Sequence, residues 1–331
     1  MKRLPAALVA LTACRADAIP PAERYPAGID LVAREVVIDG SAIRYVETGR
    51  GPPVLLLHGF GASLYAWRHT IAPLAGAGFR VVAFDNRGFG FSDKPATGYA
   101  NADYVRLVVT LLDSLGAAEA TLVGHSMGGQ IAAEVALAHP QRVRGVALLA
   151  ASGLGVRQPL LLRVARWPVI GPLVSGLRSR GMTGRILRST YADPVRVTEG
   201  DVDQYYAPVA APDYGRSLRG VLREFRFDAL VRRIDSLAVP ALVLWGERDE
   251  WIPTPLGRRL ASRVPRVAFF TVPGAGHALP EEAPDTVNRL LVTFLTEGLP
   301  RIPENLAWFT SSPCSRCSSL WTRPTRRRSA S

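Results

Sequence analysis

The chain has 331 residues, 48% of them hydrophobic, which is enough to bury a large core. Its formal net charge is +12, and all but two of its 40 basic residues are arginine. These residues are spread along the chain, with no basic run inside a recognisable nucleic-acid-binding fold, so no nucleic-acid partner is expected. No stretch of 18 uninterrupted apolar residues occurs, which excludes a membrane-spanning helix within the mature fold.

The first 14 residues have the organisation of an export signal. Lys2 and Arg3 precede a short apolar run that ends at Cys14. The residues Leu-Thr-Ala-Cys resemble the bacterial lipoprotein signature, in which the cysteine is lipidated and meets the membrane surface. A cut after Ala18 would instead release a soluble periplasmic protein, and a cytoplasmic protein with an apolar leader is the third option. Residues 15–30 are expected to form a tether.

Strands and helices alternate from residue 31 to residue 298. Arg34 to Ile38 and Ser41 to Thr48 flank Asp39-Gly40 and predict a hairpin. Further strands are predicted at 54–57, 80–85, 120–124, 143–149, 241–245 and 267–272, and helices at 65–74, 101–115, 127–139, 255–264 and 283–297. This order indicates an α/β domain with a mostly parallel sheet wrapped by helices and a hairpin at one edge.

One interval is too long for a single crossover, because about 90 residues separate the strand ending near Ala150 from the next one. Its amphipathic patches and proline turns predict a helical cap, at about residues 152–228, inserted into the domain. Aromatic cap residues are candidates for lining an acyl pocket, although ordinary packing explains most of them. They include Trp167, Tyr191, Tyr205, Tyr206 and Tyr214.

The C-terminal segment, residues 299–331, is rich in serine, proline and arginine and is predicted to be a disordered basic tail. Cys314 and Cys317 form a Cys-x-x-Cys pair without a second pair. Metal binding needs more ligands than this pair supplies, so we expect an incidental feature.

The sequence Gly124-His125-Ser126-Met127-Gly128 lies between an apolar strand and a helical pattern. A nucleophilic serine needs this geometry, because a tight strand-to-helix turn forces its hydroxyl out of the strand end and leaves room only for glycines on both sides. The N-terminus of the following helix favours negative charge there. Ser126 is therefore the predicted nucleophile.

A serine nucleophile needs a base and an orienting carboxylate. His277 lies in a glycine-rich loop directly after the strand 267–272, where α/β folds place chemistry, and is the predicted base. Asp249 follows the strand 241–245 and is the predicted carboxylate, with Glu247 and Glu250 as competitors expected to be solvated. His125, next to the serine, is expected to point elsewhere.

The chain resembles the α/β-hydrolase superfamily from about residue 33 to residue 298. Besides the serine turn, the matching motifs are Leu57-His58-Gly59-Phe60-Gly61, the Asp85 to Ser92 loop, Gly246-x-x-Asp249 and Gly276-His277. The triad order serine, aspartate, histidine is also that of this superfamily. The resemblance implies that the backbone N–H groups of Phe60 and Met127 form the oxyanion hole, whereas His58 and the Asp85 loop are scaffold elements.

A serine at position 126 excludes haloalkane dehalogenase and epoxide hydrolase chemistry, which needs an aspartate nucleophile. The prediction is a serine hydrolase that cleaves carboxylic esters, with a small-molecule ester as its partner and no metal or cofactor. Carbon–carbon bond hydrolases of meta-cleavage products resemble the chain less well at Ala62-Ser63 and Ala278. Cofactor-free haloperoxidases or perhydrolases share the triad, and a catalytically silent anchored binding protein is the alternative from another class.

Overall fold

A hairpin opens the part of the chain that the computed structural model describes, residues 31–155 and 178–299. β1 (Arg34–Ile38) and β2 (Ser41–Thr48) pair antiparallel, with Ile38 opposite Ser41. Between the strands, Asp39 and Gly40 have positive φ angles of 48° and 71°, as a two-residue type I′ turn requires. The predicted hairpin is therefore confirmed.

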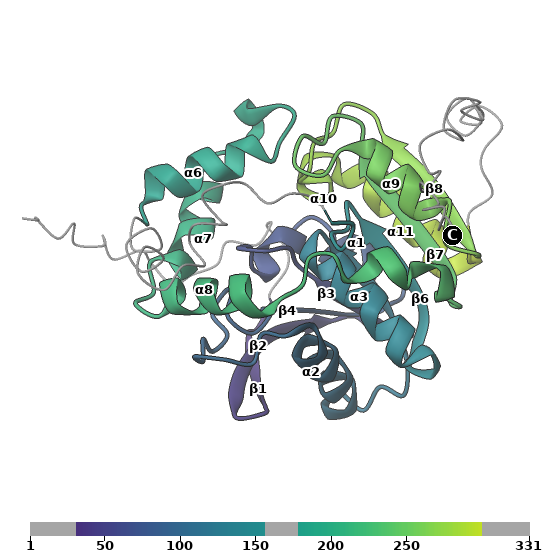
Figure 1. Cartoon of the computed structure of the whole chain (residues 1–331), viewed down its shortest axis with the longest axis horizontal. Helices are drawn as coiled ribbons and strands as arrows, with labels where there is room; N and C mark the ends of the chain where they lie inside the picture. Colours follow the sequence, from purple (N-terminus) through teal and green to yellow (C-terminus); the bar gives the residue numbers. More distant parts are fainter. Residues whose placement is uncertain (1–30, 156–177, 300–331) are drawn as a thin grey trace, which may run out of the picture. The chain divides into compact units, whose positions relative to one another are not determined.

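The described strands form one eight-stranded sheet in the order β1-β2-β4-β3-β5-β6-β7-β8 (Figure 1). β2 pairs antiparallel with β4, and every pairing from β4 to β8 is parallel. The remaining strands are β3 (Pro53–Leu57), β4 (Arg80–Phe84), β5 (Ala120–His125), β6 (Val143–Leu149), β7 (Ala241–Gly246) and β8 (Val267–Val272). The predicted mostly parallel sheet with an antiparallel edge is confirmed.

The register of the sheet brings distant loops together at the carboxyl ends of the strands. Leu57 at the end of β3 is paired with Gly124 of β5, so the chain after residue 57 runs beside the turn after residue 125. Gly246 at the end of β7 is paired with Val272 of β8, which places the two following loops side by side. Ligands of open α/β sheets bind at this edge.

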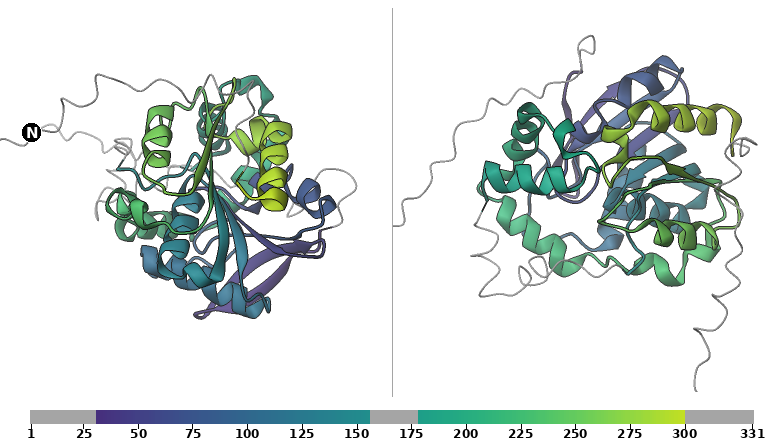
Figure 2. Two further views of the ribbon diagram at one scale, coloured as in Figure 1. Left: turned by 90° about the vertical axis from the view of Figure 1, so that its right-hand side faces the viewer. Right: turned by 90° about the horizontal axis from the view of Figure 1, so that it is seen from above.

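Helices flank the sheet (Figure 2). α1 contacts α11, whereas α2 contacts α3, and α3 also packs on β5 and β6. Their bounds are α1 (Ile71–Gly76), α2 (Asn101–Ser114), α3 (Met127–Ala138), α9 (Thr254–Ala261), α10 (Leu279–Glu282) and α11 (Pro284–Glu297). Within residues 31–155 and 178–299, no helix has the length and apolar character needed to cross a bilayer.

The single helix predicted over residues 65–74 is wrong. The structure has a short 3₁₀ helix, η1 (Leu64–Trp67), and then α1, which begins at Ile71. Pro73 has no N–H to donate to a preceding turn, which favours its place in the first turn of a helix, and α1 has it as its third residue. The side chain of Ser63 accepts a hydrogen bond from the Tyr65 N–H and fixes the start of η1.

The long interval between β6 and β7 is helical where it is described. It contains α6 (Arg180–Ser189), η3 (Pro194–Arg196), α7 (Glu199–Val209), α8 (Tyr214–Glu224), η4 (Ala229–Arg232) and η5 (Ile234–Ser236). Five buried residues form a hydrophobic cluster separate from the main core, namely Leu187, Tyr191, Val197, Val202 and Ala278. The predictions on Cys14, Trp167, the tether and the tail lie outside the described residues. We refer to residues 178–228 as the insertion.

Candidate active site

Ser126 sits on a strained turn between β5 and α3. Its φ and ψ are 53° and −116°, a conformation that non-glycine residues rarely adopt. A Cβ on Gly128 would lie 2.1 Å from the Leu57 carbonyl oxygen, and one on Gly124 would lie 2.3 Å from the Gly128 carbonyl oxygen. Close backbone packing therefore holds this serine in the geometry of a nucleophile elbow.

Asp249 and His277 form a buried hydrogen-bonded pair. His277 Nδ1 lies 2.9 Å from Asp249 Oδ2, and both residues are 5% exposed. The other carboxylate oxygen, Oδ1, accepts hydrogen bonds from the backbone N–H groups of Trp251 and Ile252, at 2.9 and 2.8 Å. The carboxylate is thus fixed on one side, and it fixes the imidazole on the other.

The competing carboxylates have other surroundings. Glu247 is exposed and accepts a hydrogen bond from the Gly274 N–H at 3.0 Å, and Glu250 is exposed as well. Of the three acids in this loop, only Asp249 is within hydrogen-bond distance of His277. Its position suits the orienting carboxylate of a triad.

His125 joins the serine turn to the histidine loop, a contact that the sequence reasoning missed. Its Nε2 lies 2.8 Å from the His277 carbonyl oxygen, so Nε2 carries the proton and donates. The two rings are 4.9 Å apart. Burial, and secondarily the charge of His277, lowers the pKa of His125 to about 3, so it stays neutral. The serine turn and the histidine loop are therefore in direct contact.

The loop after β3 lies against Ser126. A Cβ on Gly59 would be 3.2 Å from the Ser126 Cβ. The N–H groups of Phe60, next along this loop, and of Met127, the first residue of α3, donate to no other residue of the described chain. Two N–H groups without a partner beside a nucleophile can stabilise a developing oxyanion.

The buried side chains of His58 and Asp85 hold the backbone of this loop and of neighbouring segments through hydrogen bonds. His58 accepts a hydrogen bond from the Asn86 N–H at 2.9 Å and donates to the Gly59 carbonyl at 2.8 Å, and burial lowers its pKa to about 4. Asp85 is fully buried and accepts hydrogen bonds from the N–H groups of Leu64 and Phe91. Both residues are engaged with backbone groups, in agreement with a scaffold role.

Aromatic side chains border the loop after β3, which contains Phe60. The Phe60 ring meets the Phe89 and Phe227 rings edge to face, at 5.3 and 6.0 Å. The hydroxyl of the buried Tyr214, at the start of α8, would lie 3.5 Å from a Cβ on Gly61. Tyr214 and Phe227 follow β6 in the chain, so the long interval predicted to be a cap approaches the candidate site.

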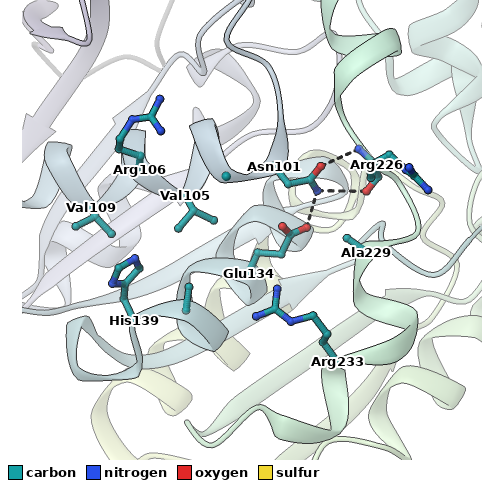
Figure 3. A pocket seen from close by; sticks show the side chains of 11 residues that line it. Asn101, Val105, Arg106, Val109, Glu134, His139, Arg226, Ala229 and Arg233 are labelled. Carbon is teal, nitrogen blue, oxygen red and sulfur yellow. Dashed lines mark hydrogen bonds between the residues drawn. The ribbon is translucent and has the colours of Figure 1, made fainter.

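A surface hollow of about 700 Å³ lies between α2, α3 and η4 (Figure 3). Asn101 and Glu134 line it and are hydrogen-bonded to one another at 2.7 Å. Burial raises the pKa of Glu134. None of the residues predicted for catalysis lines this hollow, so it is separate from the candidate active site. Residues 31–155 and 178–299 contain no group of three or more His, Cys, Asp or Glu that could hold a metal ion.

Comparisons with known proteins agree with this architecture. A family model described as alpha/beta hydrolase fold matches residues 52–171. The dihydrolipoyllysine-residue acetyltransferase component of the acetoin cleaving system of Pseudomonas putida is 31% identical over 264 residues, which cover 78% of this chain and 68% of that protein.

Two solved structures are also similar. A meta-cleavage product hydrolase of Pseudomonas fluorescens IP01 superposes with a TM-score of 0.70 at 28% identity, covering 80% of this chain and 97% of that one. Carboxylesterase CesB of Bacillus subtilis superposes with a TM-score of 0.72 at 25% identity, covering 82% and 94%. The similarity to each extends over most of both chains.

Proposed function

The chain belongs to the α/β-hydrolase family, and we propose that it is a serine hydrolase that cleaves carboxylic esters through an acyl-enzyme intermediate. The observation that carries the proposal is the buried hydrogen bond of 2.9 Å between Asp249 and His277. The loop that contains His277 also contacts the strained turn of Ser126 through His125. A carboxylate on Nδ1 fixes the imidazole tautomer and leaves Nε2 to take the serine proton.

The reaction proceeds in two halves. His277 accepts the Ser126 proton as the hydroxyl oxygen attacks the ester carbonyl, and the N–H groups of Phe60 and Met127 receive the negative oxygen. His277 then protonates the departing alcohol. Water, activated by the same imidazole, attacks the acyl-enzyme and releases the carboxylic acid, which restores Ser126. Asp249 stabilises the protonated imidazole in both halves.

Carbon–carbon bond cleavage is the competing reaction, because a similar structure is that of a meta-cleavage product hydrolase. CesB, a carboxylesterase, is equally similar in structure and supports the ester reading. The chain differs from the residues that carbon–carbon hydrolases often carry in the oxyanion-hole loop and after the catalytic histidine, where it has Ala62-Ser63 and Ala278. These departures favour esters.

The test is a panel of esters of increasing acyl length together with a dienol-ketone ring-fission product, given to the wild type and to Ser126→Ala. The proposal predicts that the esters are the better substrates and that the variant loses turnover of all of them. Faster turnover of the ring-fission product than of every ester would identify a carbon–carbon hydrolase. Peroxide-dependent oxidation that is lost in Ser126→Ala and exceeds ester turnover would identify a perhydrolase.

Export and anchoring are a second part of the proposal. The compact order of Lys2-Arg3, an apolar run and Leu-Thr-Ala-Cys supports lipidation of Cys14. Two or more acyl chains hold a protein firmly on a membrane, whereas one gives only marginal binding. Mass spectrometry of the mature N-terminus tests this: an acylated Cys14 supports the anchor, a start at Ile19 indicates a soluble exported enzyme, and an intact Met1 or Lys2 rules export out.

A further inference from the structure

Glu282, at the end of α10, has a carboxylate that the catalytic proposal does not use. It is 3% exposed and accepts three backbone N–H groups. Gly276, the residue before His277, donates to it at 2.6 Å. Ala192 and Asp193, which follow α6 in the insertion, donate at 3.1 and 2.8 Å. One buried carboxylate therefore ties the histidine loop to the insertion.

The same part of the insertion makes two more contacts around the triad. The N–H of Ala278, the residue after His277, donates to the Thr190 carbonyl at 3.0 Å. Trp251, two residues after the orienting carboxylate, donates its indole N–H to the Ser189 carbonyl at 2.9 Å. The Trp251 ring also stacks on the His277 ring, with the planes 15° apart and the centroids 5.9 Å apart. We call residues 189–193 the brace.

The brace and the histidine loop pack backbone against backbone. A Cβ on Gly276 would lie 2.5 Å from the Ala192 nitrogen and 2.8 Å from the Thr190 carbonyl oxygen, so only glycine fits there. The hydrophobic cluster of the insertion includes Ala278 as its one member from the histidine loop. Hydrogen bonds at Gly276 and Ala278 and apolar contact at Ala278 thus fix the backbone on both sides of His277.

We propose that Glu282 is a positioning residue for the catalytic base, acting through the brace. Two of its hydrogen bonds, from Ala192 and Asp193, dock the brace, and the third, from Gly276, ties the docked brace to the histidine loop. The docked brace holds the backbone on both sides of His277 and the Trp251 ring against the imidazole. The insertion thereby orients the base without supplying a member of the triad. This inference rests on the proposed function, which makes His277 the base. A displacement of about 1 Å at such a group can cost about 100-fold in rate.

The neighbouring Glu281 shows that burial alone does not give this role. Glu281 is also buried, but its carboxylate pairs with Arg68 and accepts the Tyr205 hydroxyl at 2.6 Å. It joins Arg68, the residue after η1, to α7, and its carboxylate has no hydrogen bond to the histidine loop in the described chain. The two adjacent carboxylates therefore serve different contacts.

The test is Glu282→Gln in the full-length protein. A glutamine amide has one acceptor oxygen where the carboxylate has two, and its NH2 group would face a backbone N–H that needs an acceptor. With a small activated ester, we expect kcat to fall about 10- to 100-fold while KM stays within about twofold. We also expect the low-field proton resonance of the His277 Nδ1–H bonded to Asp249 to broaden or vanish. A merely structural role would lower thermal stability and leave both readouts unchanged.

Glu247→Gln is the matched control, since Glu247 accepts an N–H from the same loop but is exposed and, within the described residues, has no hydrogen bond to the brace. Its kcat should stay within about twofold of the wild type. A normal kcat and a normal resonance in Glu282→Gln overturn the inference.

If Glu282→Gln does not fold, Trp251→Phe carries the test, because it keeps an aromatic ring on His277 and removes only the N–H to Ser189. We expect its kcat to fall about three- to tenfold, and an unchanged kcat overturns the inference. Ser126→Ala separates the two proposals. Full activity in that variant defeats the proposed function, whereas an inactive Ser126→Ala beside a normal Glu282→Gln defeats the brace alone.

Discussion

The two sides of the proposed active site, the nucleophile side around Ser126 and the base side around His277, are built by different means. Ser126 is held by close backbone packing at the ends of β3 and β5, where Gly124 and Gly128 leave no space for a side chain. His277 is held by hydrogen bonds to two buried carboxylates: its ring donates to Asp249, and the backbone N–H of the preceding Gly276 donates to Glu282. Backbone packing therefore fixes the half of the site around Ser126, whereas the half around His277 combines close backbone packing at Gly276 with polar contacts that reach into the insertion.

The base side also contacts a second, smaller core, although Ala275 of the histidine loop and Ile252 of the Asp249 loop belong to the main core. The strand residues that support the serine belong to one large buried core, whereas the brace adjoins the cluster of Leu187, Tyr191, Val197, Val202 and Ala278. A small cluster buries little apolar area and opens at lower free-energy cost than a sheet core. Substitutions of the glycines that pack the serine turn should therefore mainly lower the stability of the protein, and those that loosen the brace should mainly change its kinetics.

The largest expected effect concerns the base side. Asp249→Asn should lower kcat by about 10⁴-fold, because an amide at this position favours the wrong imidazole tautomer. Steady-state kinetics on one activated ester, for this variant and for Glu247→Gln and Glu250→Gln, provides the measurement. If either glutamate variant is as damaging while Asp249→Asn is mild, the choice of carboxylate is wrong.

The next effect concerns the nucleophile side. Gly128→Ala places a methyl group 2.1 Å from the Leu57 carbonyl oxygen and should lower the free energy of unfolding by about 3 kcal/mol. Gly181→Ala is the control in α6, where a Cβ meets nothing within 4 Å, and it should be neutral or stabilising. Urea unfolding of both variants measures the difference, and equal stability would remove the steric account of the serine turn.

The pH dependence of stability should also come from the nucleophile side. Burial lowers the pKa of His58 to about 4 and that of His125 to about 3. Because the unfolded histidines bind protons from about pH 6.5 downward, the unfolding free energy should be full above that pH. It should decline toward about pH 4, by about 3 kcal/mol for His58.

Urea unfolding of the wild type and of His58→Gln, at about pH 7 and about pH 4.5, tests this dependence. The variant should lose less stability between the two pH values than the wild type does. An identical loss in both proteins would mean that His58 is not buried as a neutral group.

The smallest expected effect distinguishes substrate selection by the chain between β6 and β7 from the support that this chain gives to His277. Phe227→Ala removes a ring beside Phe60 and should change the ratio of kcat/KM for long and short acyl esters by about tenfold. Turnover of a small activated ester should change by less than about threefold. An equal loss on all esters, in a folded variant, would contradict a substrate-selecting role for this segment.

The sequence carried enough information for the sheet and for the proposed triad, because each triad residue lies in a short motif after an apolar strand. Ser126, Asp249 and His277 could be found from local pattern alone. The break between η1 and α1 is not predicted by the sequence, because the helical pattern of residues 65–74 continues across it and outweighs the sign that Pro73 gives. The contacts of His125 and Glu282 join segments distant along the chain, and no local pattern reports which backbone groups a buried side chain will meet.

The central claim, a nucleophilic serine activated by the Asp249–His277 pair, is tested most directly with a fluorophosphonate probe. The wild type should bind one probe per chain, at Ser126, and lose its ester turnover in step with labelling. Ser126→Ala should bind none and turn over esters at least about 10⁴-fold more slowly. Stoichiometric labelling at another residue, or unchanged ester turnover in Ser126→Ala, would contradict the account.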